Sequence, residues 1–321
     1  MTAALARVAG RLALLDRPNE RSLHVRVTPR GGGLAIVAGA AAGLLAAGER
    51  MPAAAAIVLG GAGALALVGL ADDRYQLSVR LRLVLEGVAA LAIAALTGGI
   101  PRLPLPAPLD LPLGLLAIPA AILWVVALVN FFNFIDGIDG LAGAQAVITG
   151  IGVAASGWNP AAAAIGAAVA GGSAGFLAFN WAPARIFMGD AGSLALGYTF
   201  ASLPLLAAFD FRPAAVFWMM MSLWLFLADA TWTLVARAAR GEKWYAPHRE
   251  HHYQRLVQSG YGHATVSGAI ALGSLAMTAG AVRGWPDILG PAGWALAAFG
   301  LVLFLFEAAV STRRAAAAPA R

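Results

Sequence analysis

The sequence predicts an all-α fold, a polytopic bundle of about ten transmembrane helices. Hydrophobic residues make up 60% of the 321-residue chain and charged residues only 12%, whereas an ordinary soluble domain carries about 25% charged residues. The mean hydropathy of +0.76 is too high for a single globular core. These values exclude a soluble enzyme and a disordered chain. The absence of cysteine also excludes a thiol nucleophile and Cys-ligated metal sites.

Ten apolar segments are predicted to be helices. Several are shorter than the ~20 residues that span a ~30 Å hydrocarbon core, but small residues such as Gly39, Gly43, Gly171 and Gly175 favour close packing in lipid. In chain order, the segments are 33–48, 53–70, 83–98, 113–131, 141–156, 159–179, 194–209, 213–236, 264–282 and 289–311. We expect one membrane domain over 1–321, with the bundle at 33–311 and a cytoplasmic loop at 237–263.

Two segments are predicted to lie outside the bundle. Residues 1–15 are too short and too often interrupted by arginine to span a bilayer, so an amphipathic surface helix is expected there. Residues 99–112 contain several prolines and should form an extended connector on the outside.

The basic residues predict the orientation. If residues 1–32 are cytoplasmic, ten helices place both termini inside. Inside segments then hold 18 of the 22 basic residues, and the outside holds Arg50, Arg102, Arg212 and Arg283. Cytoplasmic loops are enriched in arginine and lysine. The net charge of +6 therefore reflects membrane topology, and no nucleic-acid partner is expected.

Acidic residues gather at the predicted cytoplasmic ends of the helices. Asp72 and Asp73 follow the 53–70 helix, Asp136 and Asp139 follow the 113–131 helix, and Asp190 precedes the 194–209 helix. An aspartate at the centre of a membrane helix costs roughly 2.5–3.5 kcal/mol, and this placement avoids most of that cost. The adjacent carboxylates of Asp72 and Asp73 repel each other unless a cation is close, although a solvated helix end is the simpler alternative.

Cationic and imidazole side chains are predicted to reach the same face. The 237–263 loop carries most of them, while His24 and Arg30 lie in the N-terminal segment before a run of glycines. In the loop they are His248, Arg249, His251, His252, Arg255 and His263. Imidazole and guanidinium groups together suit a phosphate-rich substrate. Asp229, inside the 213–236 helix, is expected to be a packed polar residue near this site.

The ligand chemistry favours a hard cation. Asp190 lies in a Gly-Asp-x-Gly-Ser turn before a helix, where a cation and a phosphate can bind together, although it could serve only as an N-cap. Oxygen ligands without cysteine favour Mg²⁺, or Mn²⁺, bound with phosphates. Phosphoryl transfer involving a lipid is therefore predicted. The alternative, a transporter of an anionic solute, would place its ionisable residues near the bilayer midplane.

Four ordered motifs resemble those of the polyprenyl-phosphate N-acetylhexosamine-1-phosphate transferases, glycosyltransferase family 4. The resemblance extends from about residue 14 to about residue 263. Its motifs are Asp16-Arg-Pro-Asn-Glu-Arg21-Ser-Leu-His24 with Thr28-Pro-Arg-Gly-Gly-Gly33, Asp72-Asp73, Asn130-x-x-Asn133-x-x-Asp136-Gly-x-Asp139-Gly-Leu141, and Phe187-Met-Gly-Asp190-x-Gly-Ser193. The loop sequence His248-Arg249-Glu-His251-His252 is similar to the branch that initiates O-antigen synthesis.

The resemblance implies an enzyme of the bacterial inner membrane with a cytoplasmic active site. Sugar 1-phosphate would pass from a UDP-N-acetylhexosamine to undecaprenyl phosphate, with release of UMP. The resemblance implies that Asp72, beside Asp73, is the base or the orienter of the lipid phosphate, by direct attack or through a covalent aspartyl intermediate. Asp190 would bind Mg²⁺, with Asn133 as a second ligand.

The remaining site residues are assigned by the same resemblance. Asp136 and Asp139 would border the uridine. The diphosphate or the sugar would contact His248, Arg249, His251 and His252, with His251 as a catalytic candidate and His24 and Arg30 as further substrate contacts. Family members commonly begin with one more transmembrane helix, so either the start site is misplaced or the chain tolerates the loss. Small-residue helix faces permit a homodimer.

Overall fold

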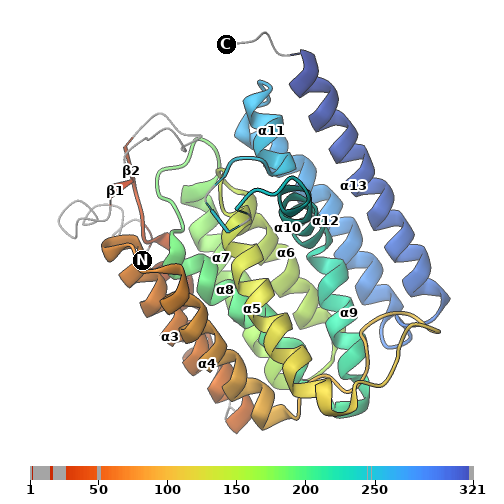
Figure 1. Cartoon of the computed structure of the whole chain (residues 1–321). Coiled ribbons are helices and arrows are strands. Elements are labelled where there is room, and N and C mark those ends of the chain that lie inside the picture. Colours follow the sequence, from red (N-terminus) through yellow and green to blue (C-terminus); the bar gives the residue numbers. More distant parts are fainter. Residues whose placement is uncertain are drawn as a thin grey trace.

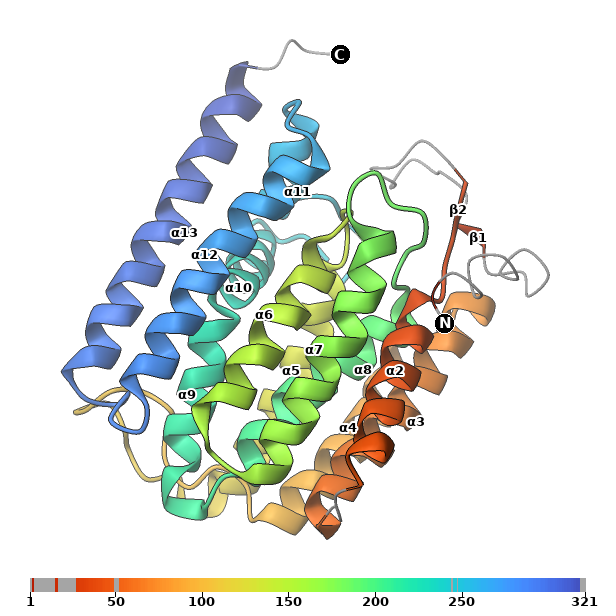
Figure 2. The same ribbon diagram turned by 180° about the vertical axis from the view of Figure 1, so that it is seen from behind.

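The structure is a computed structural model that describes Thr2 and residues 15–16, 27–48, 52–243, 245–246 and 248–317. These residues form an all-α bundle with one short strand pair, β1 (Leu15–Asp16) and β2 (Thr28–Pro29), which are antiparallel. The helices run side by side, with α2–α4 at one edge and α12 and α13 at the other (Figures 1 and 2). The predicted fold class is confirmed.

The first three helices of the bundle are α2 (Gly32–Ala47), α3 (Ala53–Tyr75) and α4 (Val79–Thr97). α4 begins where the Ser78 hydroxyl accepts a hydrogen bond from the Leu81 N–H at 3.3 Å, as an N-cap residue does. At its far end, Nη1 of Arg212 donates to the carbonyls of Thr97 and Gly99, both at 2.7 Å. That guanidinium supplies donors for carbonyls that a helix end leaves without partners.

The centre of the bundle is α8 (Asp190–Ser202), in which every residue after Asp190 is buried. It is preceded by a short 3₁₀ turn, η1 (Gly114–Leu116), and by α5 (Ala117–Ile135), α6 (Leu141–Ser156) and α7 (Pro160–Asn180), and it continues into η2 (Leu203–Leu206). Backbones approach closely here: a Cβ added to Gly33 would lie 2.1 Å from Cα of Gly192. The glycines of the GDxGS turn and of the N-terminal segment therefore allow α2 and α8 to touch.

After the short η3 (Phe209–Phe211), the predicted single helix over 213–236 is wrong. The chain forms α9 (Arg212–Ser222) and α10 (Trp224–Ala239), bent by 79°. The buried Gln145 donates its Nε2 to the Ser222 carbonyl at 2.9 Å, and the Ser222 hydroxyl bonds Thr149 and Thr278. A side chain that satisfies a backbone group in this way is a recognised cause of a helix kink.

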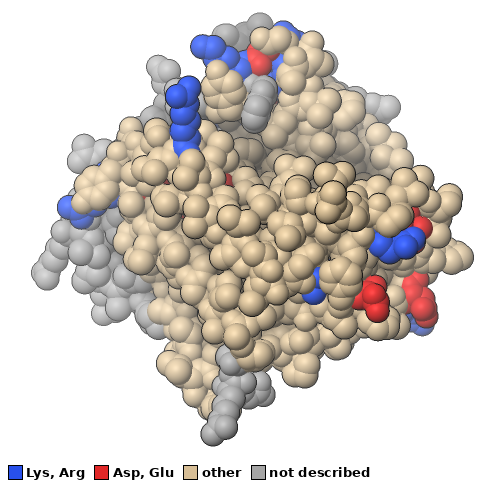
Figure 3. All heavy atoms as spheres, turned by 60° about the horizontal axis from the view of Figure 1, so that its bottom comes forward, with Lys and Arg blue, Asp and Glu red and all other residues tan. Residues whose placement is uncertain are grey.

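The chain ends in α11 (His252–Gln258), α12 (His263–Gly284) and α13 (Pro291–Ala317). Among the described residues, five helical segments are long and apolar enough to cross a membrane, or six if α9 and α10 form one broken span. Much of the surface at the η1 end of the bundle carries no charged side chain (Figure 3). The chain is an integral membrane protein, while the count of ten spans stays a prediction, as does the single-domain organisation.

Candidate active site

Three aspartates meet where the end of α3 lies against the start of α8. Asp72 and Asp73 lie in the last turn of α3, and Asp190 is the first residue of α8. Gly69 permits this contact, since an added Cβ would lie 2.2 Å from the backbone oxygen of Asp190. The structure thus brings together the two carboxylate motifs that lie more than a hundred residues apart in the sequence.

Arg82 on α4 joins two of these carboxylates. Its Nη1 donates to Oδ2 of Asp72 at 2.5 Å and to Oδ2 of Asp190 at 3.3 Å, and its side chain is only 16% exposed. Oδ1 of Asp72 also accepts a hydrogen bond from the Leu77 N–H at 2.7 Å. From the sequence alone, Arg82 is one of the basic residues of the predicted cytoplasmic side. The available signal was an arginine one turn into the helix that follows the aspartate pair.

Arg30, predicted as a substrate contact, lies on the other side of the cluster. It donates to Asp73 Oδ1 at 3.2 Å and to Asp16 Oδ2 at 2.9 Å. Burial would lower the pKa of Arg30, but Asp16, Asp73 and Asp190 together raise that pKa above its ordinary value. The guanidinium therefore stays charged. His24 lies outside the described residues.

The Asp73 carboxylate faces the start of α8, where the backbone N–H groups of Asp190 and Ala191 interact with it. Its Oδ2 is buried and receives no hydrogen bond from the residues that the structure describes. Gly189 lies against this oxygen with a φ of 73°, and a Cβ there would come within 2.6 Å of it. A glycine is thus required next to the carboxylate by both backbone conformation and space.

Asn133, in the last turn of α5, holds Asp190 from a third direction. Its Nδ2 donates to Asp190 Oδ1 at 3.0 Å and to the Ser193 hydroxyl at 2.8 Å. One turn earlier, Nδ2 of Asn130 donates to Oε2 of Glu86 on α4 at 2.5 Å, and Oε1 of the fully buried Glu86 has no partner among the described residues. Glu86 lies one turn beyond Arg82, inside an apolar helix, and no sequence motif marks it.

Asp136 and Asp139 have different surroundings. Burial, and then the nearby Asp190 carboxylate, raise the pKa of Asp136 well above its ordinary value, which places this group electrostatically within the cluster. The Asp139 carboxylate instead accepts a hydrogen bond from the Ala184 N–H at 2.9 Å and lies 3.3 Å from Nδ1 of His263. Asp139 therefore ties the α7–α8 connection and α12 to the turn after α5.

The histidines of the 237–263 loop do not all lie together in the structure. The rings of His248 and His251 lie together, with centroids 4.9 Å apart, and burial, then the neighbouring His251 and Arg237, lower the pKa of His248 to about 4. His252 instead turns toward α13, where its Nδ1 lies 2.8 Å from the Ser311 hydroxyl. The Arg249 carbonyl accepts a hydrogen bond from Gln258 at 3.1 Å, which joins the loop to α11.

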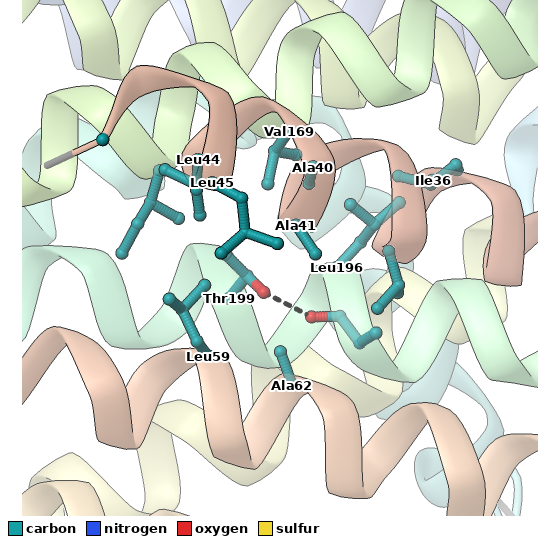
Figure 4. A pocket seen from close by; sticks show the side chains of 14 residues that line it. Ile36, Ala40, Ala41, Leu44, Leu45, Leu59, Ala62, Val169, Leu196 and Thr199 are labelled. Carbon is teal, nitrogen blue, oxygen red and sulfur yellow. Dashed lines mark hydrogen bonds between the residues drawn. The ribbon is translucent and has the colours of Figure 1, made fainter. Parts of the chain in front are cut away.

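An apolar groove of about 490 Å³ lies between α2, α3, α7 and α8 (Figure 4). The hydroxyl of Thr199, its one polar side chain, donates to the Ala195 carbonyl at 2.7 Å within the same helix. The groove thus presents no unpaired side-chain hydroxyl, and its lining is as apolar as the interior of a bilayer.

The carboxylate cluster suits a hard cation that also binds substrate. Across the described ranges, no three carboxylates or imidazoles come together as a complete metal site, and Arg82 lies between Asp72 and Asp190. Mg²⁺, however, is usually held by one or two carboxylates together with substrate phosphates and water. The unpartnered Oδ2 of Asp73 and the partly exposed carboxylate of Asp190 fit that manner of binding.

The chain is similar to a family of glycosyl transferases and to several bacterial phosphotransferases. A model described as glycosyl transferase family 4 matches residues 55–208, a range that contains the carboxylate cluster but not the histidine loop. The "Probable undecaprenyl-phosphate N-acetylglucosaminyl 1-phosphate transferase" of Bacillus subtilis is 32% identical, over 82% of this chain and 75% of that protein. The "Decaprenyl-phosphate N-acetylglucosaminephosphotransferase" of Mycobacterium tuberculosis is 29% identical, over 83% and 74%. The "Phospho-N-acetylmuramoyl-pentapeptide-transferase" of Synechococcus elongatus is 36% identical, over 62% and 59%.

Proposed function

The chain belongs to glycosyl transferase family 4, and from this membership we propose that it transfers N-acetylhexosamine 1-phosphate from a UDP-sugar to undecaprenyl phosphate. The observation that carries the proposal is the cluster of three aspartates and two arginines at one end of a membrane bundle. A site at that position can receive a lipid phosphate from the bilayer and a water-soluble nucleotide sugar from the cytoplasm.

The reaction is one phosphoryl transfer. An oxygen of the lipid phosphate attacks the sugar-bearing phosphorus of the UDP-sugar, the bond to the UMP oxygen breaks, and a lipid-linked sugar diphosphate forms. Asp72, beside Asp73, orients the attacking lipid phosphate or takes its proton. Asp72 also fixes Arg82, and the buried Oδ2 of Asp73 has no hydrogen-bond partner among the described residues. Positioning two anions and neutralising their charge is the main task of such a site.

Cations share that task. Asp190, with Asn133, would hold Mg²⁺ or Mn²⁺, which would supply positive charge to the phosphate oxygens. Arg30 and Arg82 add two permanent charges from the protein. His248, Arg249 and His251 approach the diphosphate or the sugar from the loop before α11.

The biological setting follows from the same proposal. The enzyme acts in the bacterial inner membrane with its site on the cytoplasmic face, and its product initiates O-antigen or a similar envelope polysaccharide. The donor is a UDP-N-acetylhexosamine such as the GlcNAc, FucNAc or QuiNAc derivative. A homodimer is compatible with its small-residue helix faces.

A transfer assay tests the proposal. Purified protein is mixed with undecaprenyl phosphate, Mg²⁺ and each UDP-N-acetylhexosamine in turn, and UMP release is followed. We expect release with one donor, its loss on chelation with EDTA, and its loss in D190N, which inserts normally in the membrane but lacks the metal-binding carboxylate. Full activity of D190N would remove the metal assignment, and no release with any donor from folded protein would contradict the proposed reaction.

A further inference from the structure

A buried carboxylate on α10 lies outside the machinery described above. Asp229 is 2% exposed and lies in the second turn of the helix that follows the 79° bend. A carboxylate inside a membrane protein is costly and generally persists where partners and a function retain it. Asp229 is packed and polar, as the sequence predicts, and its contacts show a more specific arrangement.

Asp229 holds the beginning of α11 from a different helix. Its Oδ1 accepts a hydrogen bond from the His252 N–H at 3.0 Å, and its Oδ2 accepts one from the Tyr253 N–H at 3.4 Å. The first N–H groups of a helix have no partners within that helix. The carboxylate therefore fixes where α11 begins and how the residue before it is oriented.

That preceding residue is His251. Its Nδ1 lies 3.2 Å from Oδ1 of Asp229, and the imidazole is 2% exposed. The ring stacks on Tyr253 with centroids 5.8 Å apart and lies 6.3 Å from the Phe134 ring. A carboxylate at Nδ1 favours the tautomer that carries its proton there, which leaves Nε2 as the acceptor nitrogen.

The same assembly is fixed relative to the carboxylate cluster. The Tyr253 hydroxyl donates to the Phe134 carbonyl at 2.9 Å, immediately after Asn133. Gly137 makes room for that hydroxyl, because an added Cβ would lie 2.1 Å from it. The position of His251 is therefore fixed relative to the end of α5, which also holds Asp190 through Asn133.

We infer that Asp229 is a positioning residue that sets the tautomer and the orientation of His251 for the transfer reaction. The carboxylate contacts no substrate and acts only through the imidazole. This inference rests on the proposed function, in which His251 contacts the diphosphate or the sugar.

The kinetic experiment is a double-mutant cycle of D229N and H251A in the full chain, with UMP release as the readout. D229N should lower kcat by about 10–100-fold with little change in KM. A loss of that size follows, in metal sites, when the carboxylate that orients a functional histidine is removed. In the H251A background, D229N should cause no further loss, since the two residues act as a unit. S274A is the control: it removes a buried hydroxyl of α12 that has no hydrogen-bond partner among the described residues and should retain near wild-type kcat.

A second measurement does not depend on activity. In ¹⁵N-histidine NMR spectra of the protein in detergent, the signal absent from H251A should report protonation at Nδ1, and D229N should lose that signature. If D229N does not fold, D229E takes its place, since it keeps the charge but moves the carboxylate by one methylene, and it should also lower kcat.

The outcomes separate the two hypotheses. Three results would overturn the positioning role. The first is an equal loss of kcat from D229N with and without His251, and the second is wild-type kcat in D229N or D229E. The third is a wild-type protein in which His251 is protonated at Nε2. A wild-type protein that shows the Nδ1 signature but releases no UMP contradicts the proposed function and leaves the arrangement of Asp229 and His251 supported.

Discussion

One nitrogen of Arg82 contacts the carboxylates of two helices, Asp72 at 2.5 Å and Asp190 at 3.3 Å. It reduces the repulsion that would otherwise separate the end of α3 from the start of α8. The carboxylate oxygens that bind the Arg82 guanidinium are the same oxygens that a divalent cation would bind. Arg82 and the cation would therefore both neutralise the carboxylates, and they would compete for the same oxygens. This residue therefore influences both the geometry of the site and its affinity for metal.

We expect the Arg82→Met variant to bind Mn²⁺ more tightly than the wild type in the absence of substrates. The gain should be about fivefold or more, since a like charge about 4 Å away costs ~1 kcal/mol even at the dielectric constant of water. Electron paramagnetic resonance titration measures the binding. Arg80→Met, an exposed change on the same helix, is the control and should leave the affinity unchanged. Unchanged or weaker binding in Arg82→Met would show that the two cations do not compete.

At the scale of elements, the break between α9 and α10 determines where the histidine loop lies. The bend of 79° turns α10 away from the direction of α9 (Figures 1 and 2), and Asp229 on α10 then reaches α11. Gln145, Thr149 and Thr278 bond the backbone or the hydroxyl of Ser222 at the break. A buried polar network from α6 and α12 thus stabilises the geometry on which the loop depends.

Replacing Gln145 by Leu should lower the stability of the protein by about 1–3 kcal/mol, the cost of leaving a buried backbone carbonyl without its donor. The midpoint of thermal unfolding in detergent should fall accordingly. Ser173→Ala is a matched control, since that hydroxyl is buried without a hydrogen-bond partner in the part of the chain described, and its loss should change the midpoint little. Equal midpoints for Gln145→Leu and Ser173→Ala would show that the Gln145 hydrogen bond does not stabilise the break.

For the whole molecule, the sequence was sufficient to predict which regions are helical and that the acidic motifs lie at helix ends. Hydropathy and Gly-Asp turns are local signals, so Asp72, Asp73 and Asp190 could be placed without a structure. Contacts made by long side chains across helices are not local, and neither the role of Arg82 nor the pairing of Asp229 with His251 could be predicted. Apolar periodicity also continues through the break at Leu223, which depends on Gln145 from another helix.

The predicted orientation of the molecule can be measured directly, because the chain has no cysteine and a single introduced thiol is unique. R249C, in the loop before α11, should react with a membrane-impermeant maleimide in inverted vesicles, since the basic residues predict a cytoplasmic loop. L109C, at the exposed Leu109 of the predicted outside connector 99–112, should react only in right-side-out vesicles. The reverse pattern would contradict the proposed cytoplasmic site.

The contacts of Gly33 with Gly192 and of Gly69 with Asp190 bring main chains directly together. Almost any substitution there would force whole helices apart, so the region around the three aspartates can accept very few changes of sequence. The loop before α11 is held differently, by side-chain ion pairs such as that of Arg240 with Glu242, which can be exchanged one at a time. The packing of α2, α3 and α8 is therefore far less tolerant of substitution than these ion pairs, any one of which can change without moving a helix.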